Sequence, residues 1–194
     1  FSKLQNIILL KSTYINERWF AIIGQLTTIN TVYLIFGFDF DFITANAIIL
    51  VGALSNLYLV YFNQKTQLLD KTAFTFLLID VLQLSFLIYL TGGISNPFSI
   101  FLIIPTIFSS SNLGFRSNFL LTTITTLIII FLTFCYVPLP FPLNEHFHVS
   151  PYYYYSIPIS LIIALIFLNY FALTFGTESR LRKEALNKME EIMS

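Results

Sequence analysis

Charged residues are scarce in this sequence. Only 10% of its 194 residues are Asp, Glu, Lys or Arg, whereas soluble domains carry about a quarter. The chain therefore lacks the polar surface that a water-soluble fold of this size needs. The acidic and basic residues also balance to a formal net charge of zero, so the chain has no basic footprint for a nucleic-acid partner.

Cysteine and catalytic motifs are scarce as well. One cysteine, Cys135, excludes an internal disulfide framework. It lies in an apolar run that we expect to be a membrane helix, and these surroundings favour a small hydrophobe over a redox thiol. Glu145, His146 and His148 lack the further ligands that a metal site requires, so we predict a solvated loop and no metal there. The sequence has no nucleotide-binding loop, catalytic triad or zinc motif, and we predict no catalytic residues.

Apolar residues are abundant, at 56% of the chain. A helix that spans a bilayer needs about 20 mostly apolar residues, and backbone amides in hydrocarbon must be satisfied within the segment. The sequence therefore predicts an all-α membrane protein, a bundle of six transmembrane helices surrounded by membrane lipid. The six predicted spans cover residues 19–38, 42–62, 73–91, 97–115, with a kink at Pro105, 117–137 and 152–176.

The distribution of cations predicts the orientation. In a six-helix chain all ten basic residues fall at one end of the bundle, and the opposite loops carry only Asp39, Asp41 and Glu145 as charges. Cytoplasmic loops are enriched in Lys and Arg, so we predict that both termini are cytoplasmic. The ten basic residues are Lys3, Lys11, Arg18, Lys65, Lys71, Arg116, Arg180, Arg182, Lys183 and Lys188.

The composition changes after Gly176, where charged residues follow the last apolar run. Leu181, Ala185, Lys188 and Ile192 have the spacing of an amphipathic helix at the start of a coiled coil. The chain opens at Phe1 and stops within this helical pattern, so we expect a piece of a longer protein. The predicted parts are a cytoplasmic segment over 1–18, the transmembrane domain over 19–176 and a linker or dimerisation helix beginning at 177–194.

Asp80 is an acid in the middle of the third predicted span. A charged residue at that depth costs roughly 2.5–3.5 kcal/mol on insertion scales and needs a partner or water. Gln83 lies on nearly the same helix face and could form a hydrogen bond with it. A proton relay, a ligand contact and a structural hydrogen bond between helices all remain open.

The loop after this span has an unusual combination of residues. Gly92 and Gly93 permit positive φ and a close approach to the backbone, and Asn96 offers both a donor and an acceptor. Pro97 suits the first turn of the next helix, and Phe98 adds an aromatic face. A ligand with a flat ring and carbonyl groups, arriving from the lipid, would suit this loop. An ordinary tight turn is the alternative.

Residues 80–84 and 89–98 closely resemble the third-helix and loop signature of RegB/PrrB-type redox-sensing histidine kinases. The family's GGxxNPF motif, in the outer loop between spans three and four, matches at Gly92, Gly93, Asn96, Pro97 and Phe98. Arg18-Trp19, Gly24-Gln25 and the loop at 138–140 also look similar. The seven-residue motif at this location is fairly specific, whereas most of the remaining similarity is apolar.

The resemblance implies a membrane input domain that senses the redox state of ubiquinone and ubiquinol in the inner membrane. The motif residues would bind the quinone, with Asp80 and Gln83 deeper in the helix. The family would add a homodimer, a cytoplasmic kinase domain that uses ATP, and a cognate response regulator. The alternatives are a small transporter or channel that uses Asp80, and a purely structural membrane anchor.

Overall fold

The computed structural model describes residues 9–62, 67–138 and 151–193 and is almost entirely helical there. Two short segments, β1 (Leu9–Leu10) and β2 (Gln67–Leu68), pair as an antiparallel bridge. The helices are α1 (Lys11–Leu34), α2 (Phe42–Phe62), α3 (Asp70–Leu90), α4 (Ile103–Asn112), α5 (Phe115–Phe134) and α6 (Pro151–Met193), with the 3-10 helices η1 (Gly93–Ser95) and η2 (Pro97–Leu102) before α4.

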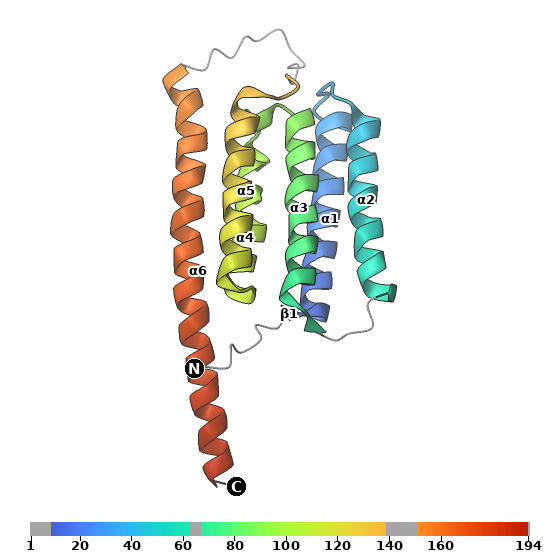
Figure 1. The fold of residues 1–194 in the computed structure, drawn as a ribbon. Helices are drawn as coiled ribbons and strands as arrows, with labels where there is room; N and C mark the ends of the chain where they lie inside the picture. Colours follow the sequence, from blue (N-terminus) through green and yellow to red (C-terminus); the bar gives the residue numbers. More distant parts are fainter. Residues whose placement is uncertain (1–8, 63–66, 139–150, 194) are drawn as a thin grey trace.

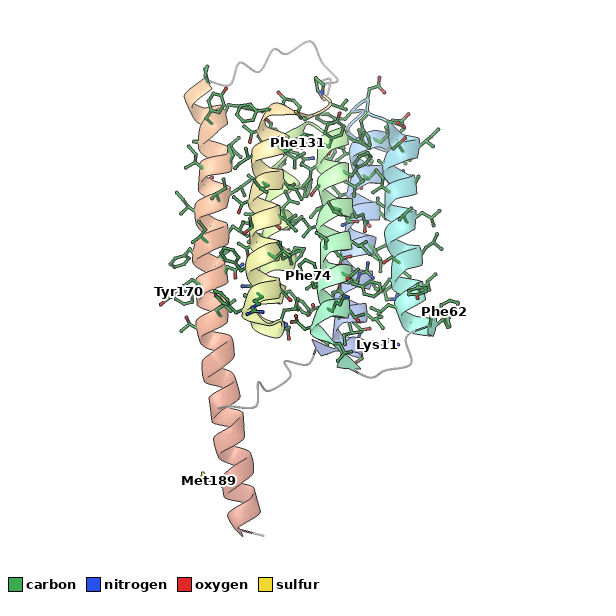
Figure 2. All side chains as sticks on the ribbon, viewed as in Figure 1. Lys11, Phe62, Phe74, Phe131, Tyr170 and Met189 are labelled. Carbon is green, nitrogen blue, oxygen red and sulfur yellow. The ribbon has the colours of Figure 1, made fainter. Side chains whose placement is uncertain are left out.

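The helices run side by side, and α6 extends well beyond the others at one end of the bundle (Figure 1). α3 has a central position, since it contacts α2, α4 and α5, while α6 packs mainly on α4 and α5. Large apolar side chains cover the outside: Phe62 and Tyr170, 74% and 66% exposed, point away from the bundle on opposite sides (Figure 2). An apolar exterior of this kind is suited to contact with lipid.

Four helical segments in the described part of the chain are long and apolar enough to cross a membrane: α2, α3, α5 and Tyr154–Thr174 of α6. Pro97–Asn112 is a shorter apolar helix. α1 has sufficient length, but it is less apolar because it contains Lys11, Glu17, Arg18 and several amides. The two predicted spans with the weakest apolar character are therefore the first and the fourth.

The start of α2 agrees with the prediction. Asp41 precedes the helix and caps it, accepting hydrogen bonds at its carboxylate from the Thr44 amide, at 3.0 Å, and from the Thr44 hydroxyl, at 2.5 Å. An acceptor at this position satisfies one of the free amides of the first turn. The same two hydrogen bonds hold the pKa of Asp41 below its ordinary value.

α1 differs from the prediction, because it begins at Lys11 and ends at Leu34 instead of covering 19–38. Its first turns are polar, but Tyr14 and Arg18 are buried there, only 2% and 5% exposed. Their contacts inside the bundle extend the helix before the apolar run. The assignment of Arg18 to a cytoplasmic flank before the first helix is therefore wrong.

The fourth predicted span consists of two kinds of helix. η2 covers Pro97–Leu102, and the backbone becomes α-helical only at Ile103. The change precedes Pro105, which lies in the first turn of α4, where a missing amide hydrogen costs little. The change of helix type therefore lies before Pro105 and not at it.

α6 continues through Gly176 to Met193 without interruption, which confirms that a helix leads directly out of the last span. The side chains of the seam residues Leu181, Ala185, Lys188 and Ile192 lie outside the described residues. Cys135 is exposed and follows the last residue of α5. The expectation that Cys135 lies within a membrane helix is therefore wrong, because α5 ends at Phe134.

Candidate functional site

The glycine-rich loop begins where α3 ends, at the end of the bundle opposite the extension of α6 (Figure 1). Gly92 and Gly93 both have positive φ, 99° and 61°. L side chains rarely adopt these values, so glycine allows the chain to reverse directly after the helix. We call residues Gly92 to Phe98 the signature loop.

Gly93 also permits a close contact within the protein. A Cβ atom at this position would lie 2.5 Å from the Cβ of Tyr136 and 2.9 Å from the carbonyl oxygen of Leu132. Both neighbours belong to the end of α5 and the segment after it. The close approach that the sequence suggested for a ligand is thus made by the protein itself at Gly93.

Asn96 organises the loop with both ends of its carboxamide. Its Nδ2 donates to the Thr91 hydroxyl at 2.7 Å and to the Thr91 carbonyl at 3.1 Å, and its Oδ1 accepts from the Phe98 amide at 2.9 Å. Asn96 therefore caps η2, whose first residue is Pro97. The Asn96 amide group is thus engaged by Thr91, the residue directly before the loop.

Pro97 and Phe98 form the outward half of the signature loop. Both are exposed, Phe98 by 38%, and its ring lies 5.8 Å from the ring of Phe101, which is 46% exposed. Ser95 is also exposed beside them. Gly92 and Gly93, in contrast, are buried. A ligand that approaches from outside meets the aromatic half of the loop.

Asp80 has two partners from α1. Arg18 forms an ion pair with its Oδ1, at 2.7 Å from Nη2 and 2.9 Å from Nε, and the Tyr14 hydroxyl donates to Oδ2 at 2.6 Å. An acid inside an apolar bundle needs a partner of this kind. The arrangement provides an internal counter-ion for Asp80.

Arg18 is held by further contacts from α2 and α3. Its guanidinium donates to the Ser55 hydroxyl at 3.0 Å and to the Asn56 Oδ1 at 3.4 Å, and it lies 5.5 Å from the centre of the Phe76 ring. Sequence reasoning predicted a partner for Asp80 but did not find Arg18. The available signal was that Arg18 directly precedes a predicted span, a position that it shares with Arg116.

Gln83 belongs to a second polar contact. Its Nε2 donates to the Gln25 Oε1 at 2.9 Å, and its carboxamide packs against Gly52, where a Cβ atom would collide with it. Asp80 lies about 15 Å along the axis from Leu90, the end of α3, at 1.5 Å per residue. Neither residue is therefore brought into the signature loop, and both connect α3 to its neighbours.

Within the described ranges, no group of three His, Cys, Asp or Glu residues is arranged to hold a metal ion. Glu145, His146 and His148 lie outside the described residues.

The profile of a six-helix family, described as the PilS-like transmembrane domain, matches residues 34–185. The chain belongs to this family. The PilS-like match includes α2 to α5, the signature loop and most of α6, and the family's six transmembrane helices agree with the predicted number of spans.

The PilS-like chain is also similar to a curated protein, the sensor histidine kinase RegB of Cereibacter sphaeroides. The two are 27% identical over 178 residues, which is 90% of this chain and 38% of that protein. The chain thus spans well under half the length of this relative. No solved structure matches.

These comparisons confirm the resemblance to the membrane part of RegB-type kinases. Together with the apolar helices they identify a multi-pass protein of the bacterial inner membrane. They also support its classification as a membrane sensor domain of the histidine-kinase type. The ligand that such a domain detects is a separate question.

Proposed function

We propose that this domain senses the redox state of a quinone, and that the quinone binds on the outward half of the signature loop. The observation that carries the proposal is the exposed aromatic face of Phe98 and Phe101 beside Pro97. Aromatic rings stack on one another with favourable geometry at centroid distances of about 4.5–7 Å. A lipid-soluble ligand with a flat ring can reach this face directly from the bilayer.

The polar groups next to these rings suit the carbonyl groups of ubiquinone or the hydroxyls of ubiquinol. Ser95 is exposed and Asn96 is half-buried. Because the amide hydrogens of Asn96 bind Thr91, a quinone carbonyl that accepts from Asn96 has to compete with that contact. Gly92, Gly93 and Asn96 then shape the loop, while Pro97 and Phe98 provide the surface for the quinone.

The proposed orientation has both termini in the cytoplasm and the signature loop at the periplasmic side. Lys71 in the first turns of α3 and Arg116 in the first turn of α5 lie at the end from which α6 extends (Figure 1). The positive-inside rule makes this end cytoplasmic. Arg18 is buried inside the bundle and is therefore not counted among the cations of the cytoplasmic end.

α6 would carry the signal to cytoplasmic domains of the whole protein. Those domains would use ATP to phosphorylate a histidine and pass the phosphoryl group to a response regulator, and the whole protein would be a homodimer. A redox-dependent difference in quinone affinity between two packings of the bundle would shift the balance between them. The class of the curated relative supports these expectations.

A transporter or channel that uses Asp80 as a coupling acid is not favoured by any contact in the site. Such an acid has to exchange protons or ions with water during the cycle. Both carboxylate oxygens of Asp80 accept bonds from Arg18 and Tyr14, which is the arrangement of a structural ion pair.

The test is a titration of the full-length protein, reconstituted in liposomes, with ubiquinone and ubiquinol, measuring autophosphorylation. We expect the two redox forms to give different rates, and we expect Phe98→Ala to reduce the difference at least about fivefold, within the usual range of allosteric coupling. Asn96→Ala should also weaken the response, because it removes the cap of η2.

Phe119→Ala is the matched control, since this phenylalanine of α5 is 63% exposed and belongs to no contact of the signature loop. It should respond as wild type does. Autophosphorylation that is indifferent to quinone redox state would contradict the proposal, and would leave the structural membrane anchor as the better description. A response that survives Phe98→Ala unchanged would contradict the location of the site.

A further inference from the structure

The inner side of the signature loop is part of the packing around α6. Ile94 is 1% exposed and belongs to a buried apolar cluster with Leu132 of α5 and Leu161 and Leu165 of α6. The short helix η1 that contains Ile94 lies against α3, α5 and α6. The loop therefore has an exposed face at Phe98 and, a few residues away, a buried face against the helix that leaves the bundle.

The segment after α5 makes a second connection to the same loop. Tyr136 fills the space beside Gly93 that a Cβ atom would need. The Val137 amide donates to the Tyr89 carbonyl at 2.9 Å, which fixes this segment to the end of α3. Leu132, the other neighbour of Gly93, belongs to the buried cluster against which Tyr154 of α6 packs. The loop at Gly93 and Tyr136 therefore pack directly against each other.

Tyr154 connects the first turns of α6 to α5. Its hydroxyl donates to the Thr133 carbonyl at 2.6 Å. Pro158 lies within α6 and cannot donate the helical hydrogen bond to the Tyr154 carbonyl. The outermost part of α6 is thus attached to α5 and is joined to the rest of α6 at a weakened position.

We propose that Ile94, Tyr136 and Tyr154 are positioning residues that couple the signature loop to α6. The inference rests on the proposed quinone binding at Pro97 and Phe98. A ligand on the outer face shifts the loop, and close packing transmits the shift through Ile94 and Tyr136 to the first turns of α6. The occupied and empty loops thereby favour different packings of α6, which extends toward the C-terminus.

Two variants test the coupling, each with a matched control. Tyr154→Phe removes the hydroxyl that binds Thr133, and Tyr155→Phe makes the same change in the neighbouring tyrosine, which is 49% exposed. Ile94→Ala removes the buried side chain of the loop, and Ile100→Ala makes the same change in η2 at a residue that is 54% exposed. Tyr154→Phe preserves the ring and therefore remains informative if Ile94→Ala folds poorly.

The full-length protein is reconstituted in liposomes with ubiquinone or ubiquinol. Binding is followed by photo-crosslinking of an azidoquinone, and the response by autophosphorylation. Tyr154→Phe and Ile94→Ala are expected to bind quinone within about twofold of wild type, and to lose the redox-dependent change in rate by about fivefold or more. Both controls should retain binding and response.

A second arm uses liposomes without quinone and separates the two proposals. Loss of the α6 contacts should change the basal autophosphorylation of Tyr154→Phe and Ile94→Ala but not of the controls. If wild type binds no quinone, the proposed function fails and the basal rates alone decide the coupling. If both variants match wild type in both arms, the coupling is wrong even where quinone sensing holds.

Discussion

Arg18 and Asp80 place two opposite charges inside the bundle, 2.7 Å apart. Removing one partner of a buried pair leaves the other charge uncompensated, which typically costs about 3–5 kcal/mol. We predict that Arg18→Met lowers the free energy of unfolding by about this amount. Denaturation of the purified domain in mixed detergent and SDS micelles measures the change.

Two further variants make this test specific. Glu17→Gln alters an exposed carboxylate adjacent to Arg18 and should change stability by no more than about 0.5 kcal/mol. The double variant Arg18→Met/Asp80→Leu should recover most of the loss, since removing both charges can be nearly neutral. An Arg18→Met protein as stable as Glu17→Gln would contradict a structural role for the pair.

A substitution at Gly93 is also expected to lower the stability of the domain. Gly93→Ala introduces a Cβ atom against Tyr136 at a φ of 61°, and strain of this kind costs about 1–3 kcal/mol. We predict a loss of this size in the same unfolding assay. Gly24→Ala is the control, because a Cβ at Gly24 meets nothing within 4 Å. It should be neutral or slightly stabilising in the helix.

For single residues, the sequence predicted which side chains need a partner or a special backbone conformation, but it did not predict the residues that they contact. The need of Asp80 for a partner follows from its place in an apolar run, and the turn at Gly92 and Gly93 follows from their residue type. Arg18 was assigned to a flank because burial is decided by contacts with α2 and α3, which local hydropathy does not contain. The internal hydrogen bonds of Asn96 similarly depend on the geometry of Thr91.

α5 and α6 are joined by a buried polar contact within apolar surfaces. The Asn118 Nδ2 donates to the Asn169 Oδ1 at 2.9 Å, and the Asn169 Nδ2 donates to the Thr122 hydroxyl at 2.7 Å. Asn118 and Asn169 are 3% and 5% exposed. Because the alternative partners in hydrocarbon are few, this contact favours one register of α6 against α5.

We predict that Asn118→Leu and Asn169→Leu each destabilise the domain, and that their effects are not additive. Interhelical hydrogen bonds in membranes contribute about 0.6–2 kcal/mol. A double-mutant cycle in the unfolding assay should give a coupling energy in this range. Additive losses would mean that the two side chains stabilise the domain independently.

The predicted helix bounds were accurate where polar residues mark the ends of a helix, and inaccurate where polar side chains are buried inside the bundle. The bounds of α2 were predicted because the capping residue Asp41 and the apolar run agree. α1 begins before its predicted start because Tyr14 and Arg18 are stabilised inside the bundle by partners remote in sequence. The fourth span was drawn as one helix because the Asn96 cap and the 3-10 geometry of η2 leave no periodic signal.

In the whole molecule, the proposed transfer of the signal depends on the continuity of α6. Gly176 lies inside this helix, and a Cβ there would have only ordinary contacts, 3.6 Å from Ser111. Gly176→Ala should therefore retain the quinone response in full-length protein, whereas Gly176→Pro should interrupt the helix. We predict that Gly176→Pro keeps quinone binding and loses the redox-dependent change in autophosphorylation. An intact response in this variant would exclude a rigid connection through α6.

The proposed site and the proposed route of the signal both require that the signature loop and the extension of α6 lie on opposite sides of the membrane. The most direct test of this arrangement is labelling of single cysteines in intact cells with an impermeant maleimide, in a background where the exposed Cys135 is replaced by Ser. Ser95→Cys and Arg116→Cys place the label at exposed positions at the two ends of the bundle. We expect Ser95→Cys to react in intact cells and Arg116→Cys to react only after permeabilisation. Labelling of Arg116→Cys in intact cells would overturn this orientation.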